Sequence, residues 1–216
     1  MGLGQEMKPN EFVATVGKLK ASAILRTNDE ESARRAMDAA VQGGFRVIEF
    51  TFTVPGVIDL IREFSQRDGL IVGAGTVLTV EDAHKAVEAG ASYLVSPVVD
   101  EKIIQTAREL GVTAMPGCST PTEMLAAYRA GAGLQKLFPG QGIGPAWVQQ
   151  TLGPLPFLKI VPTSGVTLEN ARDYLKAGSY ALGFVNSLFG PDDIAQGRFD
   201  VITDRARQML EVVSGG

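Results

Sequence analysis

The sequence has little of several residues on which enzyme sites often depend. Among its 216 residues there is one cysteine, Cys118, and one histidine, His84. A single cysteine excludes an internal disulfide and is typical of a reducing compartment, and we interpret Cys118 as a buried small residue. His84 lies in a polar stretch that predicts an exposed helix face, which argues against a Ser-His-Asp triad and a histidine-based zinc site. Chemistry in this chain therefore has to use Lys, Glu, Asp, Arg, Thr or Tyr.

The sequence also lacks the usual features of nucleic-acid-binding, membrane and secreted proteins. Its formal net charge is -4 and it contains no block of Lys and Arg, so electrostatics favour neither nucleic acid nor an anionic membrane as a partner. No apolar run reaches the roughly 18 residues of a membrane-spanning helix. The first residues show neither the apolar core of a signal peptide nor a myristoylation motif. We therefore expect a cytoplasmic protein.

No linker rich in Pro, Gly or Ser divides the chain, so residues 1–216 are expected to form one domain. Short apolar segments alternate with helical patterns, and most of them follow a glycine that can terminate the preceding helix. Such alternation predicts parallel strands covered by helices. With their leading glycines, the segments are 21–25, 43–49, 69–73, 90–95, 111–115, 131–136, 157–161 and 178–183.

Eight strand-helix units favour closure into a (β/α)8 TIM barrel, although the chain is short for that fold. Asn10 is expected to cap a leading helix, and a closing helix is expected from about residue 191. The competing architecture is an open doubly wound sheet. It is less favoured because the chain has neither a Walker-type phosphate loop nor a dinucleotide-binding glycine motif after the first strand. We therefore predict an α/β protein with one (β/α)8 barrel and an extra amino-terminal helix.

Lys136 is the most informative residue for function. It lies in the apolar segment 134–138, which predicts a buried strand that ends at Pro139. Burial disfavours the charged form of lysine and lowers its pKa from about 10.4. A neutral amine in a dry pocket is a nucleophile that forms Schiff bases with ketones. The alternative, which this segment alone leaves open, is a lysine that reaches solvent or pairs with a carboxylate.

The carboxyl ends of barrel strands are where such folds carry their chemistry. Lys136, Glu49 and Arg26 are expected there, within a ring of small, hydroxyl and proline residues. This set suits imine chemistry, because Lys136 can attack a ketone, Glu49 can move protons, and Arg26 with the hydroxyls can hold a carboxylate. The other members of the ring are Thr51, Thr53, residues 73–76, Ser96, Pro97, residues 116–118, residues 162–165, Asn186 and Ser187.

Simpler interpretations of the same residues stay open. Glu49 can pair with Arg26 or Lys136 without any catalytic role. The glycine-rich segment 73–76 can be only a tight loop, and prolines such as Pro97 and Pro116 can serve only to end strands. The segment 162–165 is either a turn or a cradle of backbone N–H groups for an anion.

Several motifs, taken in order, resemble those of one enzyme family. They are GFRVIEFTFT at 44–53, GAGTV at 73–77, VSP at 95–97, MPG at 115–117, TPTE at 120–123, KLFP at 136–139 and VPTSGV at 161–166. From about Ala21 to Leu188 the chain is similar to the class I 2-keto-3-deoxy-6-phosphogluconate (KDPG) and 4-hydroxy-2-oxoglutarate (KHG) aldolases. The resemblance implies a (β/α)8 barrel, usually a homotrimer, that needs no metal or other cofactor. It also implies reversible cleavage of a 2-keto-4-hydroxy acid to pyruvate and an aldehyde through a lysine imine.

Position by position, the resemblance implies roles for individual residues. Lys136 matches the Schiff-base lysine, and Glu49 matches the acid/base that takes the proton of the C4 hydroxyl when C3–C4 breaks. Thr76 matches a threonine that helps to hold the pyruvate carboxylate. The remaining residues that we expect at the substrate are Arg26, Thr53, Pro97, Phe138, Thr163, Ser164, Gly165 and Asn186.

Departures from the family pattern bear on the substrate. Thr53 stands where many members carry an arginine that grips the carboxylate. Ser164 stands where members often have a glycine, and Val185 and Asn186 stand where members often have glycine and serine. Because Val185 adds bulk where a phosphate would approach the backbone, the sequence suggests an unphosphorylated substrate or a rearranged phosphate site.

Three other functions are compatible with parts of this pattern. A decarboxylase of oxaloacetate-like acids would use the same enamine, so the sequence does not separate it from an aldolase. A barrel that binds a keto acid without turning it over would explain the changes at Thr53 and Val185, but it has no need of a buried amine. An epimerase-type barrel for sugar phosphates would want metal ligands or a second carboxylate and an intact phosphate loop, which we do not find.

Overall fold

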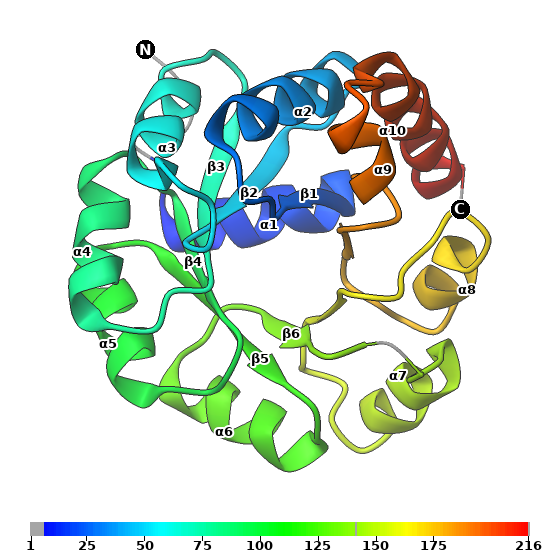
Figure 1. Cartoon of the computed structure of the whole chain (residues 1–216). Helices are drawn as coiled ribbons and strands as arrows, with labels where there is room; N and C mark the ends of the chain where they lie inside the picture. Colours follow the sequence, from blue (N-terminus) through cyan, green and yellow to red (C-terminus); the bar gives the residue numbers. More distant parts are fainter. Residues whose placement is uncertain (1–6, 141, 216) are drawn as a thin grey trace.

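In the part of the chain that the structure describes, eight parallel strands form a sheet in the order β7-β6-β5-β4-β3-β2-β1-β8 (Figure 1). The computed structural model describes residues 7–140 and 142–215, so the expectations about targeting signals in residues 1–6 lie outside the described residues. The prediction of a (β/α)8 barrel with an extra amino-terminal helix is confirmed. The strands are β1 (Ala21–Leu25), β2 (Val47–Thr51), β3 (Ile71–Gly75), β4 (Tyr93–Ser96), β5 (Thr113–Cys118), β6 (Gln135–Leu137), β7 (Ile160–Pro162) and β8 (Leu182–Phe184).

Helices surround the strands, and α1 crosses the ring of strands in the view of Figure 1. The carboxylate of Asp29 caps α2 by accepting a hydrogen bond from the Ser32 backbone N–H at 2.7 Å. The helices are α1 (Pro9–Leu19), α2 (Glu30–Gln42), α3 (Val57–Ser65), α4 (Val80–Glu88), α5 (Glu101–Glu109), α6 (Pro121–Ala130), α7 (Pro145–Leu152), α8 (Ala171–Lys176), α9 (Pro191–Ala195) and α10 (Phe199–Ser214).

Two helix boundaries differ from the prediction. The leading helix begins at Pro9 with Lys8 as its N-cap, so the expectation that Asn10 caps it is wrong; proline suits the first helical position because that position needs no N–H donor. The closing helix is divided into α9 and α10. Gly197 between them has a φ of 67°, a left-handed conformation that interrupts helical geometry and that glycine adopts without strain.

The apolar side chains form two layers, which follow from the alternation of side chains along each strand. One layer lies between the strands and the surrounding helices and contains residues such as Leu25, Ile48 and Phe50. The other lies inside the barrel and contains Val47 and Tyr93, on which Phe12 of α1 stacks with ring centres 4.6 Å apart. Helix α1 therefore closes the amino-terminal end of the barrel, and the chemistry expected of this fold is left to the opposite end.

The barrel closes between β7 and β8 through a single parallel bridge between Thr163 and Gly183. A Cβ atom on Gly183 would lie 2.5 Å from Cγ2 of Thr163, so the close approach of the two strands requires glycine at this position. This seam places the segment after β7 beside the segment after β8. None of the helices in the described part of the chain is long and apolar enough to cross a membrane.

Candidate active site

Lys136 lies inside the barrel on β6, above Leu134 of the interior apolar layer. The two side chains share a face because residues two apart on a strand point the same way. Only 8% of Lys136 is exposed, and its Nζ lies 5.0 Å from the centre of the Phe138 ring. Burial lowers the pKa of this amine below its ordinary value, the negative charge of Glu49 opposes that shift, and the nearby Arg26 adds to it. The sequence-based expectation of a buried lysine with a lowered pKa is met.

Glu49 lies on the interior face of β2 and is fully buried. Neither of its carboxylate oxygens has a hydrogen-bond partner within the described residues, so Glu49 does not pair with Arg26 or Lys136 through hydrogen bonds. Burial raises the pKa of this carboxyl, while the charges of Lys136 and Arg26 act in the opposite direction. A buried, unpaired carboxylate costs stability and is typical of functional sites.

Gly75 and Tyr93 surround Glu49. Tyr93 was not predicted from the sequence, and Gly75 was predicted only as one member of the segment 73–76. A Cβ atom on Gly75 would lie 2.0 Å from Oε1 of Glu49, so the carboxylate occupies the space that a side chain would take. Tyr93 lies below, where its hydroxyl donates to the Ile48 carbonyl at 2.9 Å, and Gly73 leaves room for its ring. The sequence signal for this arrangement is the pair Gly73 and Gly75. They occupy alternate positions of β3, so both face the barrel interior and leave space for larger side chains there.

Arg26, Thr76 and Thr53 lie on the rim at the carboxyl ends of β1, β3 and β2. A guanidinium nitrogen of Arg26 donates to the hydroxyl of Thr76 across 3.4 Å, and the hydroxyls of Thr51 and Thr53 share a hydrogen bond of 2.7 Å. Thr76 has a φ of 58°, a left-handed backbone conformation that is unfavourable for a β-branched residue. Backbone strain of this kind concentrates at binding and catalytic sites, which makes Thr76 a strong candidate for ligand contact.

The predictions for several other residues are confirmed only in part. Pro97 directly follows the end of β4, whereas Pro116 lies inside β5, so its interpretation as the end of a strand is wrong. Cys118 is buried, and burial raises the pKa of its thiol to about 12, which fits the predicted structural role. Phe138 follows Lys136 and is joined to Pro139 by a cis peptide bond. His84 is exposed on α4, as predicted.

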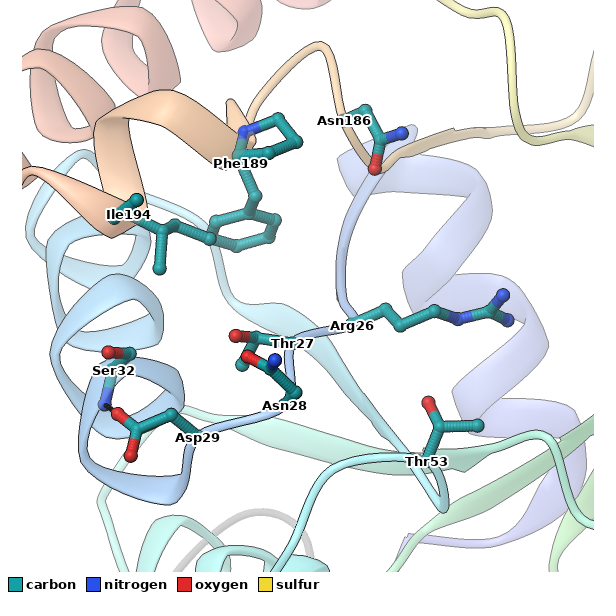
Figure 2. A pocket seen from close by; sticks show the side chains of 11 residues that line it. Arg26, Thr27, Asn28, Asp29, Ser32, Thr53, Asn186, Phe189 and Ile194 are labelled. Carbon is teal, nitrogen blue, oxygen red and sulfur yellow. Dashed lines mark hydrogen bonds between the residues drawn. The ribbon is translucent and has the colours of Figure 1, made fainter.

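Two cavities meet at Asn186 on the same end of the barrel. One, of about 490 Å³, contains the predicted residues Arg26 and Thr53. Figure 2 shows Arg26 extending between Asn186 and Thr53, away from Asp29. This cavity is lined by Arg26, Thr27, Asn28, Asp29, Ser32, Thr53, Asn186, Phe189, Pro191, Ile194 and Ala195. The other, of about 320 Å³, is lined by Ser164, Gly165, Val166, Thr167, Val185, Asn186 and Ser187.

Lys136 and Glu49 are not among the residues that line either cavity. Arg26 connects Lys136 and Glu49 to the larger cavity, because Arg26 lines that cavity and its charge shifts the pKa of both Lys136 and Glu49. Thr163 is buried at the seam of the barrel, where its hydroxyl donates to the Leu137 carbonyl at 3.3 Å. The fold therefore brings the predicted residues to one end of the barrel, with the amine and the carboxylate inside and the cavities around them.

Comparison with known proteins identifies the family. The sequence model of the family described as KDPG and KHG aldolase matches residues 13–204. The chain belongs to this aldolase family. The KHG/KDPG aldolase of Escherichia coli (strain K12) is 34% identical over 203 residues, which cover 93% of this chain and 94% of that protein. This aldolase is thus a carbon–carbon lyase.

Two further relatives support the assignment. A probable 2-dehydro-3-deoxy-6-phosphogalactonate aldolase of Rhizobium meliloti (strain 1021) is 36% identical over 172 residues, covering 78% of this chain and 81% of that protein. The crystal structure of the 2-keto-3-deoxy-6-phosphogluconate aldolase of Zymomonas mobilis ZM4, solved with 3-phosphoglycerate, superposes with a TM-score of 0.78. Its sequence identity is 27%, and the alignment covers 91% of this chain and 94% of that chain.

The contact between Gly75 and Glu49 leads to a testable prediction for this aldolase. In the Gly75→Ala variant the new methyl group displaces the Glu49 carboxylate, because the atoms it meets belong to the end of that side chain and not to the backbone. We expect kcat for aldol cleavage to fall by about 10²-fold, the size of effect that a misplacement of about 1 Å can have. The thermal midpoint should change little.

The matched control is Gly144→Ala, since a Cβ atom at Gly144 meets no other atom within 4 Å. This variant should keep the wild-type kcat. A Gly75→Ala enzyme with unchanged kcat would show that the space beside Glu49 is not needed for the reaction.

Proposed function

We propose that this protein is a class I aldolase that reversibly cleaves a 2-keto-4-hydroxy acid to pyruvate and an aldehyde. One observation carries the proposal: an amine and a carboxylate, Lys136 and Glu49, are buried together inside the barrel and each shifts the pKa of the other. The first group suits nucleophilic attack and the second suits proton transfer. The aldolases to which the chain is similar support the same reaction class.

The reaction begins at the amine of Lys136 in its neutral form. Nζ attacks the C2 carbonyl of the keto acid, and loss of water gives an iminium ion. Glu49 then accepts the proton of the C4 hydroxyl as the C3–C4 bond breaks. The bonding electrons move into the iminium and leave an enamine on Lys136, while the aldehyde departs. Protonation at C3 and hydrolysis of the imine release pyruvate and return the free amine.

The rim residues are proposed to bind the substrate. Arg26, Thr76 and Thr53 hold the carboxylate next to the ketone, because a guanidinium and two hydroxyls provide the donors that a carboxylate needs. Thr53 is uncharged, so Arg26 has to supply the positive charge that pairs with the substrate carboxylate. Pro97 and Phe138 form walls of the pocket. Thr163, Ser164, Gly165 and Asn186 are proposed to lie along the part of the substrate beyond C4.

The lowered pKa of Lys136 predicts how imine formation depends on pH. Only the neutral amine attacks, so the rate of imine formation with pyruvate should rise with pH and level off above the pKa of Lys136. Because burial lowers that pKa, the midpoint should lie below the ordinary lysine value. Rates of inactivation by pyruvate plus cyanoborohydride, measured across pH, give this midpoint. A midpoint at or above the ordinary value would contradict the proposed environment of the amine.

Borohydride trapping tests the function directly. The enzyme is reduced in the presence of pyruvate, and intact mass and peptide mapping locate the adduct. A pyruvate-derived adduct on Lys136 supports the imine mechanism, and its absence from folded protein refutes it. Parallel assays of aldehyde release from 2-keto-4-hydroxy acids and of carbon dioxide release from oxaloacetate distinguish the aldolase from a decarboxylase that shares the same enamine.

The remaining features of the proposal rest on the sequence and the resemblance. We infer one barrel domain over residues 1–216, a homotrimer and a cytoplasmic location. Leu78, Val80 and Val98 are exposed apolar residues in the segments that follow β3 and β4. Such side chains favour contact between subunits when they form a common surface.

A further inference from the structure

The segment after β8 contributes to both cavities at the carboxyl end of the barrel. Val185, Asn186 and Ser187 line the smaller cavity, and Asn186 also lines the larger one. The hydroxyl oxygen of Ser187 is buried and has no hydrogen-bond partner within the described residues. A buried polar group without a partner costs free energy, and a bound substrate can supply the missing contact. The position of this segment therefore decides where its polar groups meet the part of the substrate beyond C4.

A tight turn directly after β8 carries these residues. Strand β8 ends at Phe184. The N–H groups of Leu188 and Phe189 both donate to the Val185 carbonyl, at 3.0 and 2.8 Å, and close the turn. The side chains of Leu188 and Phe189 pack into the apolar layer between the strands and the helices. Apolar packing is not directional, so the orientation of the turn depends on further hydrogen bonds from another element.

Arg205 of α10 supplies such hydrogen bonds. One of its terminal nitrogens, Nη1, donates to the Leu188 carbonyl at 2.8 Å, and the other, Nη2, donates to Oδ2 of Asp193 at 2.8 Å. Asp193 lies in α9, directly after the turn, and is only 7% exposed. Hydrogen bonds from Arg205 first, and then from Arg198, hold the pKa of the Asp193 carboxyl below its ordinary value. A guanidinium can join a carbonyl to a carboxylate in this way because its donors have fixed directions.

The helix that carries Arg205 is itself fixed on the barrel. Helix α10 lies against α2 (Figure 1), and there the hydroxyl of Thr203 donates to the Ala39 carbonyl at 3.1 Å. At the end of α2, a Cβ atom on Gly43 would lie 2.3 Å from Cβ of Ala206, so the two segments approach closely. Arg205 therefore connects the turn to a part of the fold that is held by packing and hydrogen bonds of its own.

We propose that Arg205 is a positioning residue for substrate binding, because it ties the turn after β8 and the adjoining α9 to α10. Through the Leu188 carbonyl it fixes Asn186 and Ser187 where they meet the substrate beyond C4. Both terminal nitrogens of Arg205 are bound within the protein, so Arg205 orients the turn and does not contact the substrate. The inference rests on the proposed aldolase function and adds a residue that governs binding of the aldehyde part of the substrate.

The test compares a substrate that reaches the turn with one that does not. Pyruvate ends at C3, whereas 2-keto-3-deoxygluconate and its 6-phosphate extend to C6. The acid used is whichever of these two the wild-type enzyme cleaves with the higher kcat/KM. In the Arg205→Met variant KM for that acid should rise by about tenfold while kcat changes by less than about threefold, because binding is weakened in the ground state and the transition state alike. The pyruvate concentration that gives half-maximal inactivation with cyanoborohydride should stay at its wild-type value.

Arg198→Met is the matched control. The Arg198 side chain donates to the other oxygen of Asp193, Oδ1, and to Gln196, but not to the turn. This variant should leave KM for the acid at its wild-type value, whatever its effect on the thermal midpoint. If Arg205→Met does not fold, Arg205→Lys decides. A lysine ammonium does not reproduce the forked contact of the guanidinium, so KM should still rise by about threefold.

The inference is overturned if a folded Arg205→Met variant keeps the wild-type KM, or if Arg198→Met raises KM equally, which would assign the effect to the ion pair with Asp193. A matching rise in the pyruvate concentration for half-maximal inactivation overturns it as well, since the whole site would then be disturbed. A wild-type enzyme that traps pyruvate but cleaves neither acid also contradicts it. If the wild-type enzyme forms no pyruvate adduct, the aldolase proposal itself fails, which the trapping experiment shows separately.

Discussion

The Lys136→Met variant is expected to lose aldol cleavage, by about 10⁴-fold or more in kcat, because methionine cannot form the imine on which every later step of the proposed mechanism depends. It should also give no pyruvate adduct on borohydride reduction. Methionine is unbranched, apolar and similar in length, so it fills the interior of β6 without leaving a large cavity. Pyruvate release, trapping followed by intact mass, and circular dichroism of the variant are the measurements.

The stability of this variant provides an independent check on the buried amine. Because the pKa of Lys136 is lowered in the folded state, the unfolded chain binds more protons between that pKa and the ordinary lysine value. Within that window the wild-type free energy of unfolding therefore gains a contribution that rises with pH. The Lys136→Met variant lacks this contribution. Urea denaturation at several alkaline pH values shows how steeply the free energy of unfolding rises with pH in the wild type and in the variant.

Lys159→Met is the control for the loss of a lysine. Lys159 lies just before β7, and its Nζ is 5.8 Å from the centre of the Tyr180 ring. This variant should keep both the adduct and the activity. A Lys136→Met enzyme that still forms a pyruvate adduct would show that another amine is the nucleophile.

The Glu49→Gln variant is expected to separate imine formation from bond cleavage. Glutamine has the shape of glutamate but cannot accept the C4 hydroxyl proton, so kcat should fall by about 10²- to 10⁴-fold. Pyruvate should still be trapped on Lys136, since the amine is intact. Removal of the negative charge also removes the influence that raises the pKa of Lys136, so the pH midpoint for trapping should move to lower pH. The fold should be retained, because the wild-type carboxylate has no hydrogen-bond partner to lose within the described residues.

Glu88→Gln on the exposed face of α4 is the matched control, and it should change neither kcat nor the trapping midpoint. The outcome that would remove Glu49 from the mechanism is a Glu49→Gln enzyme with wild-type kcat. A loss of trapping together with the loss of cleavage would assign Glu49 to imine formation instead.

Local patterns in the sequence predicted the barrel and its buried amine. Short apolar segments that alternate with helical patterns specify strands and helices, because side-chain periodicity depends only on neighbouring residues. The same periodicity places Lys136 on the face of Leu134, and Glu49 on the face of Val47, inside the barrel. Predictions failed where one residue decides a boundary: Pro9 starts α1 before Asn10, and Gly197 divides the closing helix.

The sequence by itself thus determined the fold class and the burial of Lys136 and Glu49 inside the barrel. Only the tertiary structure decided that the Glu49 carboxylate lies against Gly75 without a hydrogen-bond partner, and that Asp29 faces the same cavity as Phe189. Such contacts join residues that are distant along the chain. They depend on strand register and on the closure of the barrel, which local periodicity does not encode.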